Sequence, residues 1–173
     1  YSLANLRCNP NQGFTMVEYI TRAALINIGS SNLSENILKV KRAQTRNISG
    51  ATFLSHSSKD DSVMPAVVLI LESHGASVYL DKKDESLQTK PPRDIAKTLR
   101  ERIVLARKFI VFASDNIKDS KWVPWELGLA DGYKAPSNVA LFPAPEKANE
   151  AKWTEQEYLG IYDRIVWGRI GDA

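Results

Sequence analysis

The sequence predicts an α/β protein, with a parallel sheet that carries helices on both faces. From about residue 50 onward, short strand-like apolar segments alternate with segments whose apolar residues recur with the period of a helix. One strand-like segment, Lys108–Ala113, is apolar almost throughout, which is typical of a strand covered on both faces. Strands and helices that alternate in this way favour a parallel sheet.

The expected elements follow in chain order. Strands are expected at residues 51–55, 76–80, 108–113 and 138–142, with a fifth at 160–166. The first helix stops at Gly75, and its apolar stripe consists of Val63, Ala66, Val67, Ile70 and Leu71. The second helix begins at Asp94, and its stripe consists of Ile95, Leu99, Ile103 and Ala106. A third helix covers residues 122–132.

Residues 1–49 do not follow this alternation. We interpret them as a partly helical N-terminal extension ahead of a domain at residues 50–173. The segment at residues 34–46 is basic and fits either a helix or a strand. One helical face, ended by Gly29, is formed by Val17, Ile20, Ala24 and Ile28.

Composition and charge narrow the possible functions. The net charge of +3 and the pI of about 9.0 are only mildly basic, and acidic residues are interspersed, so no nucleic-acid partner is expected. One cysteine and two histidines exclude an internal disulfide and disfavour a structural zinc site. The longest uncharged apolar stretch, residues 63–71, is about half of a membrane span, and no secretory signal is recognisable. We therefore expect a soluble, cytoplasmic protein without a bound metal.

A glutamate in an aromatic setting is the strongest candidate for chemistry. Trp122 and Glu126 share one face of the expected helix, one turn apart. Pro124 fits only the first turn of a helix, so Glu126 is expected in or just after that turn, with the indoles of Trp122 and Trp125 on two sides. A carboxylate among aromatic rings is a candidate catalytic group. The alternative is a solvated glutamate at the start of an amphipathic helix.

Polar loops should surround this glutamate. Ligands of parallel α/β sheets bind beyond the carboxyl ends of the strands, which here lead into loops at residues 55–60, 81–93 and 114–121. The first loop offers hydroxyls, a cation and helix-terminus N–H groups to a phosphate. The residues that supply them are Ser55, His56, Ser57 and Lys59. The alternative is a polar loop that only caps a helix.

Other sequence signals are absent. The chain has no G-x-G-x-x-G segment, no Walker A loop and no G-x-S-x-G elbow, which disfavours an ordinary dehydrogenase, a P-loop ATPase or a serine hydrolase. Ser55, His56 and Asp60 lie too close together on one loop to form a catalytic triad easily. His74 stands at an expected helix end and is interpreted as structural.

Three segments resemble the TIR domain in their order and spacing. They are FLSHSSKDD at residues 53–61, VYLD at residues 78–81 and SKWVPWELGLADG at residues 120–132. They look most like the bacterial branch of the family, which includes Thoeris-type antiviral sensor proteins. The resemblance covers roughly residues 51–143. It implies a flavodoxin-like fold and, in many members, cleavage of NAD at the nicotinamide–ribose bond, with NAD as substrate and no cofactor.

The resemblance also implies roles for particular residues. The family's catalytic glutamate stands in a W-x-x-x-E pattern, which falls on Trp122 and Glu126. From the residues themselves, Asp81 either hydrogen-bonds a ribose or merely ends its strand, and Trp125 is expected in the core because Leu129 lies one turn behind it. The loop at residues 81–93 is expected to gate the site and to mediate self-association, with the basic residues 39–46 as a second candidate contact.

The leading hypothesis is an NAD glycohydrolase or cyclase of bacterial antiviral defence, whose product, ADP-ribose or a cyclic ADP-ribose-type signal, acts on a downstream effector. Nicotinamide leaves NAD as a neutral ring, so no general acid is needed, unlike in most glycosidases. A single carboxylate can stabilise the oxocarbenium-like ribose that remains. The alternatives are a non-catalytic TIR module that assembles through the 81–93 loop, and an enzyme related to nucleoside deoxyribosyltransferases.

Overall fold

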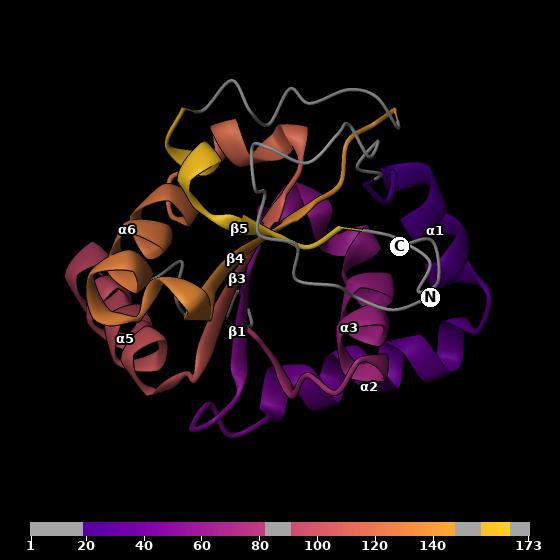
Figure 1. Ribbon diagram of the computed structural model, residues 1–173. Coiled ribbons are helices and arrows are strands. Elements are labelled where there is room, and N and C mark those ends of the chain that lie inside the picture. The colour runs from indigo at the N-terminus through magenta and orange to yellow at the C-terminus, as the bar shows by residue number, and fades with distance from the viewer. Residues whose placement is uncertain (1–18, 82–90, 148–156, 167–173) are drawn as a thin grey trace.

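The computed structural model describes residues 19–81, 91–147 and 157–166 of the chain. Its sheet consists of β1 (Thr52–Ser55), β2 (Val78–Leu80), β3 (Lys108–Ala113), β4 (Val139–Pro143) and β5 (Asp163–Arg164). Every pair of neighbouring strands is parallel, in the order β2-β1-β3-β4-β5. Helices lie on both sides of this sheet (Figure 1). The predicted α/β class is confirmed, and the strand order is the flavodoxin-like one.

The helices precede or connect these strands. They are α1 (Arg22–Ser30), α2 (Leu33–Thr45), α3 (Met64–Ser73), α5 (Pro92–Leu105) and α6 (Val123–Tyr133). Short 3-10 turns also occur, namely η1 (Ser58–Val63), η2 (Asp115–Asp119), η3 (Pro136–Asn138) and η5 (Glu157–Ile161). Among the helices in the described part of the chain, none is both long and apolar enough to cross a lipid bilayer.

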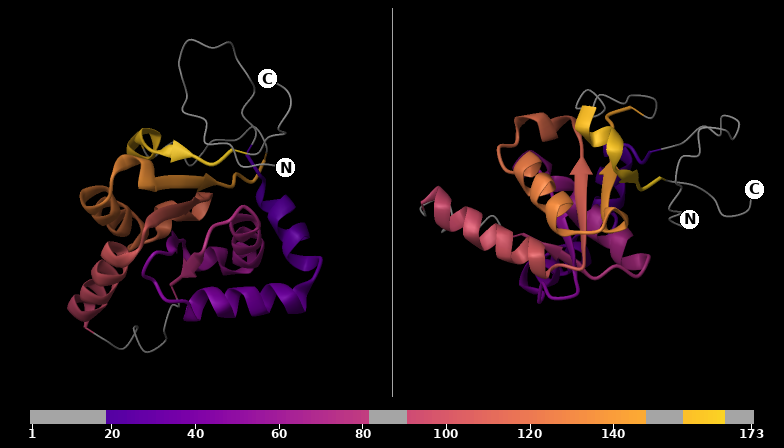
Figure 2. Two further views of the ribbon diagram at one scale, coloured as in Figure 1. Left: turned by 60° about the horizontal axis from the view of Figure 1, so that its bottom comes forward. Right: turned by 60° about the vertical axis from the view of Figure 1, so that its left-hand side comes forward.

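The central strands divide their side chains between two cores, one on each face of the sheet. In β3, Ile110 and Phe112 pack with α1, α2 and α3, whereas Phe109 and Val111 pack with α5 and α6. Figure 2 shows the same division of the helices between the two faces. Because successive side chains of a strand point to opposite faces, both sets of β3 residues have to be apolar.

The two N-terminal helices belong to the first of these cores. Leu25 of α1 and Ala43 of α2 have no exposed surface and lie in one apolar cluster with Val67 of α3. The hydroxyl of Thr21 caps α1 by accepting a hydrogen bond from the N–H of Ala24 at 3.2 Å. Residues ahead of β1 therefore complete one face of the sheet.

The structure answers some of the expectations for this N-terminal part and leaves others open. The segment at residues 34–46 forms a helix, α2, rather than a strand, and Arg46 is the C-cap that follows its last turn. Val17 lies outside the described residues, and Ile20 is buried but precedes α1, which begins at Arg22. The division of the chain into an extension and a domain at residue 50 stays a prediction.

The other elements lie close to their expected positions, with one exception. Strands β1 to β4 agree with expectation within two residues at each end, and α5 begins at Pro92 rather than Asp94, because proline suits the first helical position. The fifth strand expected at residues 160–166 is present as β5, but it is shorter than expected, because η5 continues to Ile161. Ile161 is 73% exposed, and only the short β5 pairs with β4 at this edge of the sheet.

The core position of α1 generates a prediction. Leu25→Ala should lower the free energy of unfolding by about 2–5 kcal/mol, the usual cost of a cavity in a packed core. Ile26→Ala is the matched control, because the Ile26 side chain is 49% exposed and its loss should cost less than about 1 kcal/mol. Urea unfolding measures both, and equal small effects would mean that α1 is not part of the cooperative core.

Candidate functional site

The carboxyl ends of β1 and β2 and the segment that follows β3 open into one cavity of about 410 Å³. Its wall is built from the end of β1 through the start of η1, from the residue after β2, from Ile95 and Leu99 of α5, and from the end of η2 through the first turn of α6. All seven residues expected at a site lie on this wall: Ser55, His56, Ser57, Lys59, Asp81, Trp122 and Glu126. The structure thus brings them together, and their individual roles stay predictions.

Glu126 is held on the cavity wall from two sides. It lies in the first turn of α6, where its N–H donates to the carbonyl oxygen of Trp122 at 2.8 Å, and Pro124 occupies the same turn, as expected. Its side chain is buried, and the Ser55 hydroxyl at the end of β1 donates to its Oε2 at 2.5 Å. A helix N-terminus also favours an anion. Glu126 is therefore a fixed, buried carboxylate and not a solvated one.

Only one of the two indoles expected beside Glu126 lines the cavity. Trp122 lines the cavity, and its ring meets that of Trp125 edge to face, with centroids 5.5 Å apart at an angle of 81°. Trp125 lies off the cavity wall and packs with the α5–α6 core, where the guanidinium of Arg100 lies 6.0 Å from its ring. Trp122 thus lies on the cavity wall, and Trp125 lies against the core, as expected for it.

Asp81 does more than end its strand, because it also ties β2 to α5. Its Oδ1 accepts a hydrogen bond from the Tyr79 hydroxyl at 3.1 Å and pairs with the guanidinium of Arg102. Burial raises the pKa of Asp81, and the charge of Arg102 opposes that rise. Burial and the charge of Asp81 also raise the pKa of Tyr79 to about 12. Nothing in the sequence pointed to Arg102, which lies 21 residues away on α5.

Lys59 already has a carboxylate partner at the cavity. Its Nζ lies 2.6 Å from Oδ2 of Asp119, and both side chains line the cavity while remaining about half exposed, at 58% and 47%. The hydrogen bond and the charge of Lys59 lower the pKa of Asp119. Sequence reasoning singled out the loop at residues 114–121 but missed Asp119, because no motif marks it. An anionic ligand would have to share or displace this pair.

The remaining polar residues of the loop after β1 are also engaged. His56 is buried, and its Nε2 lies 2.9 Å from Oδ1 of Asp61. Asp60 pairs with Arg22, while Ser55 bonds to Glu126, so these contacts form no Ser-His-Asp triad. Among the residues with a described position, no group of three or more His, Cys, Asp or Glu could hold a metal ion.

Comparison with known proteins identifies the family. A family model described as the TIR domain matches residues 52–161. The chain belongs to the TIR domain family. It is also similar to a protein of Bacillus cereus (strain MSX-D12) named "Probable 3' cyclic ADP-D-ribose synthase ThsB'", with 36% identity over 120 residues, which are 68% of this chain and 61% of the relative. This match confirms the resemblance to bacterial TIR proteins of the Thoeris type. The family match begins at β1, so α1 and α2 lie outside it.

One expectation cannot be placed on this site. Most of the loop at residues 81–93, expected to gate the cavity and to mediate self-association, lies outside the described residues. Its two ends are described, at Asp81 on the cavity wall and at the start of α5.

The bond between Ser55 and Glu126 leads to a prediction. Ser55→Ala should lower the free energy of unfolding by about 1–3 kcal/mol, because a buried carboxylate loses a hydroxyl donor. The control is Ser58→Ala, which removes an exposed hydroxyl from the same cavity wall and should change stability by less than about 0.5 kcal/mol. In a Glu126→Gln background, Ser55→Ala should lower the free energy of unfolding by a smaller amount. Urea unfolding of the four variants tests this, and equal costs in both backgrounds would contradict the coupling.

Proposed function

We propose that this protein cleaves NAD at the nicotinamide–ribose bond, with Glu126 as the catalytic carboxylate. The observation that carries the proposal is the position of Glu126, buried at a helix start on the wall of the cavity at the carboxyl edge of the sheet. Membership of the TIR family supports NAD as the substrate. The name of the Bacillus cereus relative, a probable synthase of a cyclic ADP-ribose, agrees with that substrate.

The bond to be broken suits a single carboxylate. The pyridinium of NAD leaves as neutral nicotinamide, so the leaving group needs no proton, and the positive charge that develops on the ribose is the feature to be stabilised. A preorganised anion provides that stabilisation, and partly apolar walls strengthen it. Ser55 holds the carboxylate of Glu126 in place, and the indole of Trp122 offers a flat surface for the nicotinamide or the adenine ring.

The rest of the cavity suits the dinucleotide. We place the phosphates at the wall formed by His56, Ser57 and Lys59, which offers the Ser57 hydroxyl and the Lys59 cation, with Lys59 shared between the phosphates and Asp119. We place a ribose at Asp81, whose carboxylate lines the same cavity. NAD is the substrate in this scheme, and no cofactor is required.

The product and the biological role are also part of the proposal. The product would be ADP-ribose or a cyclic ADP-ribose-type signal, made in the cytoplasm during antiviral defence and read by a separate effector. Self-association through the loop at residues 81–93 would close the site, and a monomeric mass by light scattering at every active concentration would contradict it. Incubation of the pure protein with NAD and with deoxynucleosides distinguishes this enzyme from an inactive TIR module and from a deoxyribosyltransferase.

Turnover should depend on Glu126. Glu126→Gln keeps the shape of the side chain and removes its charge, so nicotinamide release should fall by at least about 100-fold, the scale for loss of one key electrostatic group. Glu101→Gln removes a charge from an exposed glutamate of α5 and should leave the rate unchanged. Chromatographic measurement of nicotinamide tests both, and near-wild-type turnover in Glu126→Gln would refute the mechanism.

The ion pair of Lys59 and Asp119 leads to a prediction about the affinity for NAD. In a Glu126→Gln background, Lys59→Ala should weaken NAD binding, and more at low salt than at high salt, because salt screens exposed charges. Asp119→Asn should strengthen binding, because it releases Lys59 and removes a negative charge from the cavity wall. Lys108→Ala is the control, because Lys108 is exposed at the start of β3 and does not line the cavity. Calorimetric titration measures the affinities, and equal values in all variants would exclude Lys59 from the site.

A further inference from the structure

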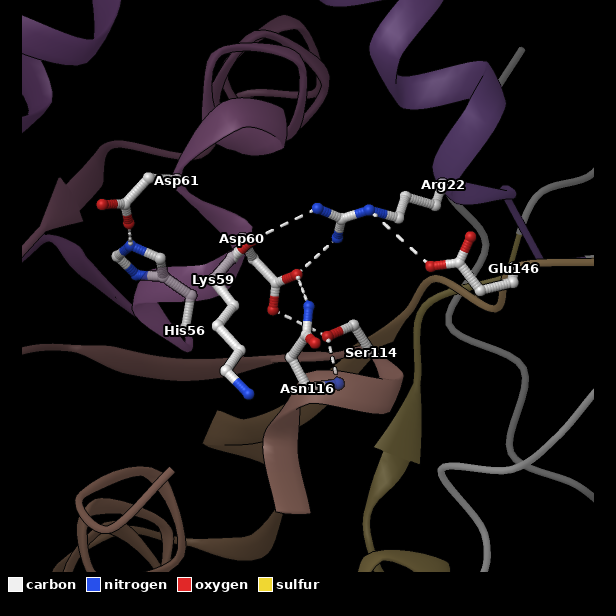
Figure 3. A network of polar contacts seen from close by, with 8 residues as sticks. All are labelled: Arg22, His56, Lys59, Asp60, Asp61, Ser114, Asn116 and Glu146. Atoms are coloured by element: carbon white, nitrogen blue, oxygen red, sulfur yellow. Dashed lines mark hydrogen bonds and ion pairs between the residues drawn. The ribbon is translucent and has the colours of Figure 1, made fainter. Parts of the chain in front are cut away.

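Directly behind the cavity wall lies a carboxylate with no exposed surface, that of Asp60 in η1. Two segments distant in sequence hold it, the start of α1 and the turn after β3 (Figure 3). The Ser114 hydroxyl donates to Oδ2 at 2.7 Å, and Nδ2 of Asn116 donates to Oδ1 at 2.7 Å. The guanidinium of Arg22, at the start of α1, pairs with the same Oδ1. We call these four residues the Asp60 network.

The Asp60 network joins two turns that both contribute to the cavity. Asp60 follows Lys59 in η1, whereas Ser114 and Asn116 lead into η2 and are linked there by an N–H to hydroxyl bond of 3.1 Å. Residues 57–59 and 119–120 line the cavity on either side. Asp60 itself does not line it. The network therefore ties the two walls together from behind, while the pair of Lys59 and Asp119 ties them at the cavity.

Arg22 supplies the charge that this arrangement needs. A fully buried carboxylate is tolerated when a counter-charge and hydrogen bonds replace the water it has lost. The Arg22 side chain is itself mostly buried, at 16% exposed, and a second guanidinium nitrogen donates to the carbonyl oxygen of Lys59 at 3.3 Å. On its other side, the Arg22 N–H donates to the carbonyl oxygen of Pro145 at 3.0 Å, and Nε lies 3.7 Å from Glu146.

We propose that Arg22 and Asp60 are positioning residues, and that α1 sets through them the spacing of the two cavity walls that bind the substrate. Arg22 lies outside the segment that matches the TIR family model. Its contribution to the site therefore comes from α1, which precedes that segment. The proposal rests on the proposed function where it names NAD as the substrate. Glu126 is held separately, by Ser55 and α6, so the network acts on substrate binding more than on the chemical step.

The experiment compares Arg22→Gln with Glu72→Gln. Glu72 of α3 forms a partly buried pair with Arg46 at 2.6 Å, and neither residue belongs to the cavity wall. Loss of this pair therefore controls for a general loss of stability. In Arg22→Gln the KM for NAD should rise at least about tenfold while kcat stays within about threefold, whereas Glu72→Gln should change neither. Arg22→Lys, which keeps the charge, should restore part of the loss.

Amide hydrogen exchange provides a second measurement, which needs no NAD. In Arg22→Gln, exchange should accelerate in residues 57–63 and 114–120, and in Glu72→Gln it should not. If Arg22→Gln does not fold, Asn116→Ala removes a neutral donor from Asp60 and should produce the same pattern in a weaker form. Unchanged exchange in both turns, or a KM shift no larger than that of Glu72→Gln, would overturn the proposal. A wild-type chain that cleaves no NAD would refute the proposed function alone, and the exchange data would still decide whether Arg22 holds the two turns.

Discussion

The carboxylate of Asp60 lies where the N-terminal helix, the turn after β1 and the turn after β3 meet, and it is the contact on which the shape of the cavity depends. The apolar cores bring the sheet and helices together, but apolar contacts have little directional preference. Hydrogen bonds and the ion pair of Asp60 do have direction, and they orient both turns. Loss of one partner from a buried pair of this kind costs about 3–5 kcal/mol, a large fraction of the stability of a small domain.

Two buried carboxylates in this protein have different surroundings. Asp60 lies behind the cavity wall, and its charge is matched by Arg22. Glu126 lies on the wall itself, where the Ser55 hydroxyl and the N-terminus of α6 hold it. Asp60 is thus separated from the cavity, whereas Glu126 lines the space that a ligand would occupy. This difference in position supports a structural role for Asp60 and a chemical role for Glu126.

The residues of the cavity wall could be predicted from the sequence, but their contacts with one another could not. Residues such as Ser55, Lys59 and Asp81 stand at the ends of strands, and parallel strands bring such ends together whatever the details of packing. Their partners, Glu126, Asp119 and Arg102, lie 21 to 71 residues away. The pairing of these distant residues depends on the strand order and on the side of the sheet that each helix covers.

Local chemistry by itself determined much of the fold. The apolar run of β3, the stripe of α3 and Pro124 at the start of α6 locate their elements, because each pattern reports the period or the first turn of one element. The position of Glu126 on α6 follows from the same evidence. Only the tertiary structure decided that α1 and α2 complete one core, that β5 is a two-residue edge strand, and that Arg22 neutralises Asp60 across 38 residues. These features depend on burial and on pairing between distant segments, and a pattern within one segment carries no record of its partner.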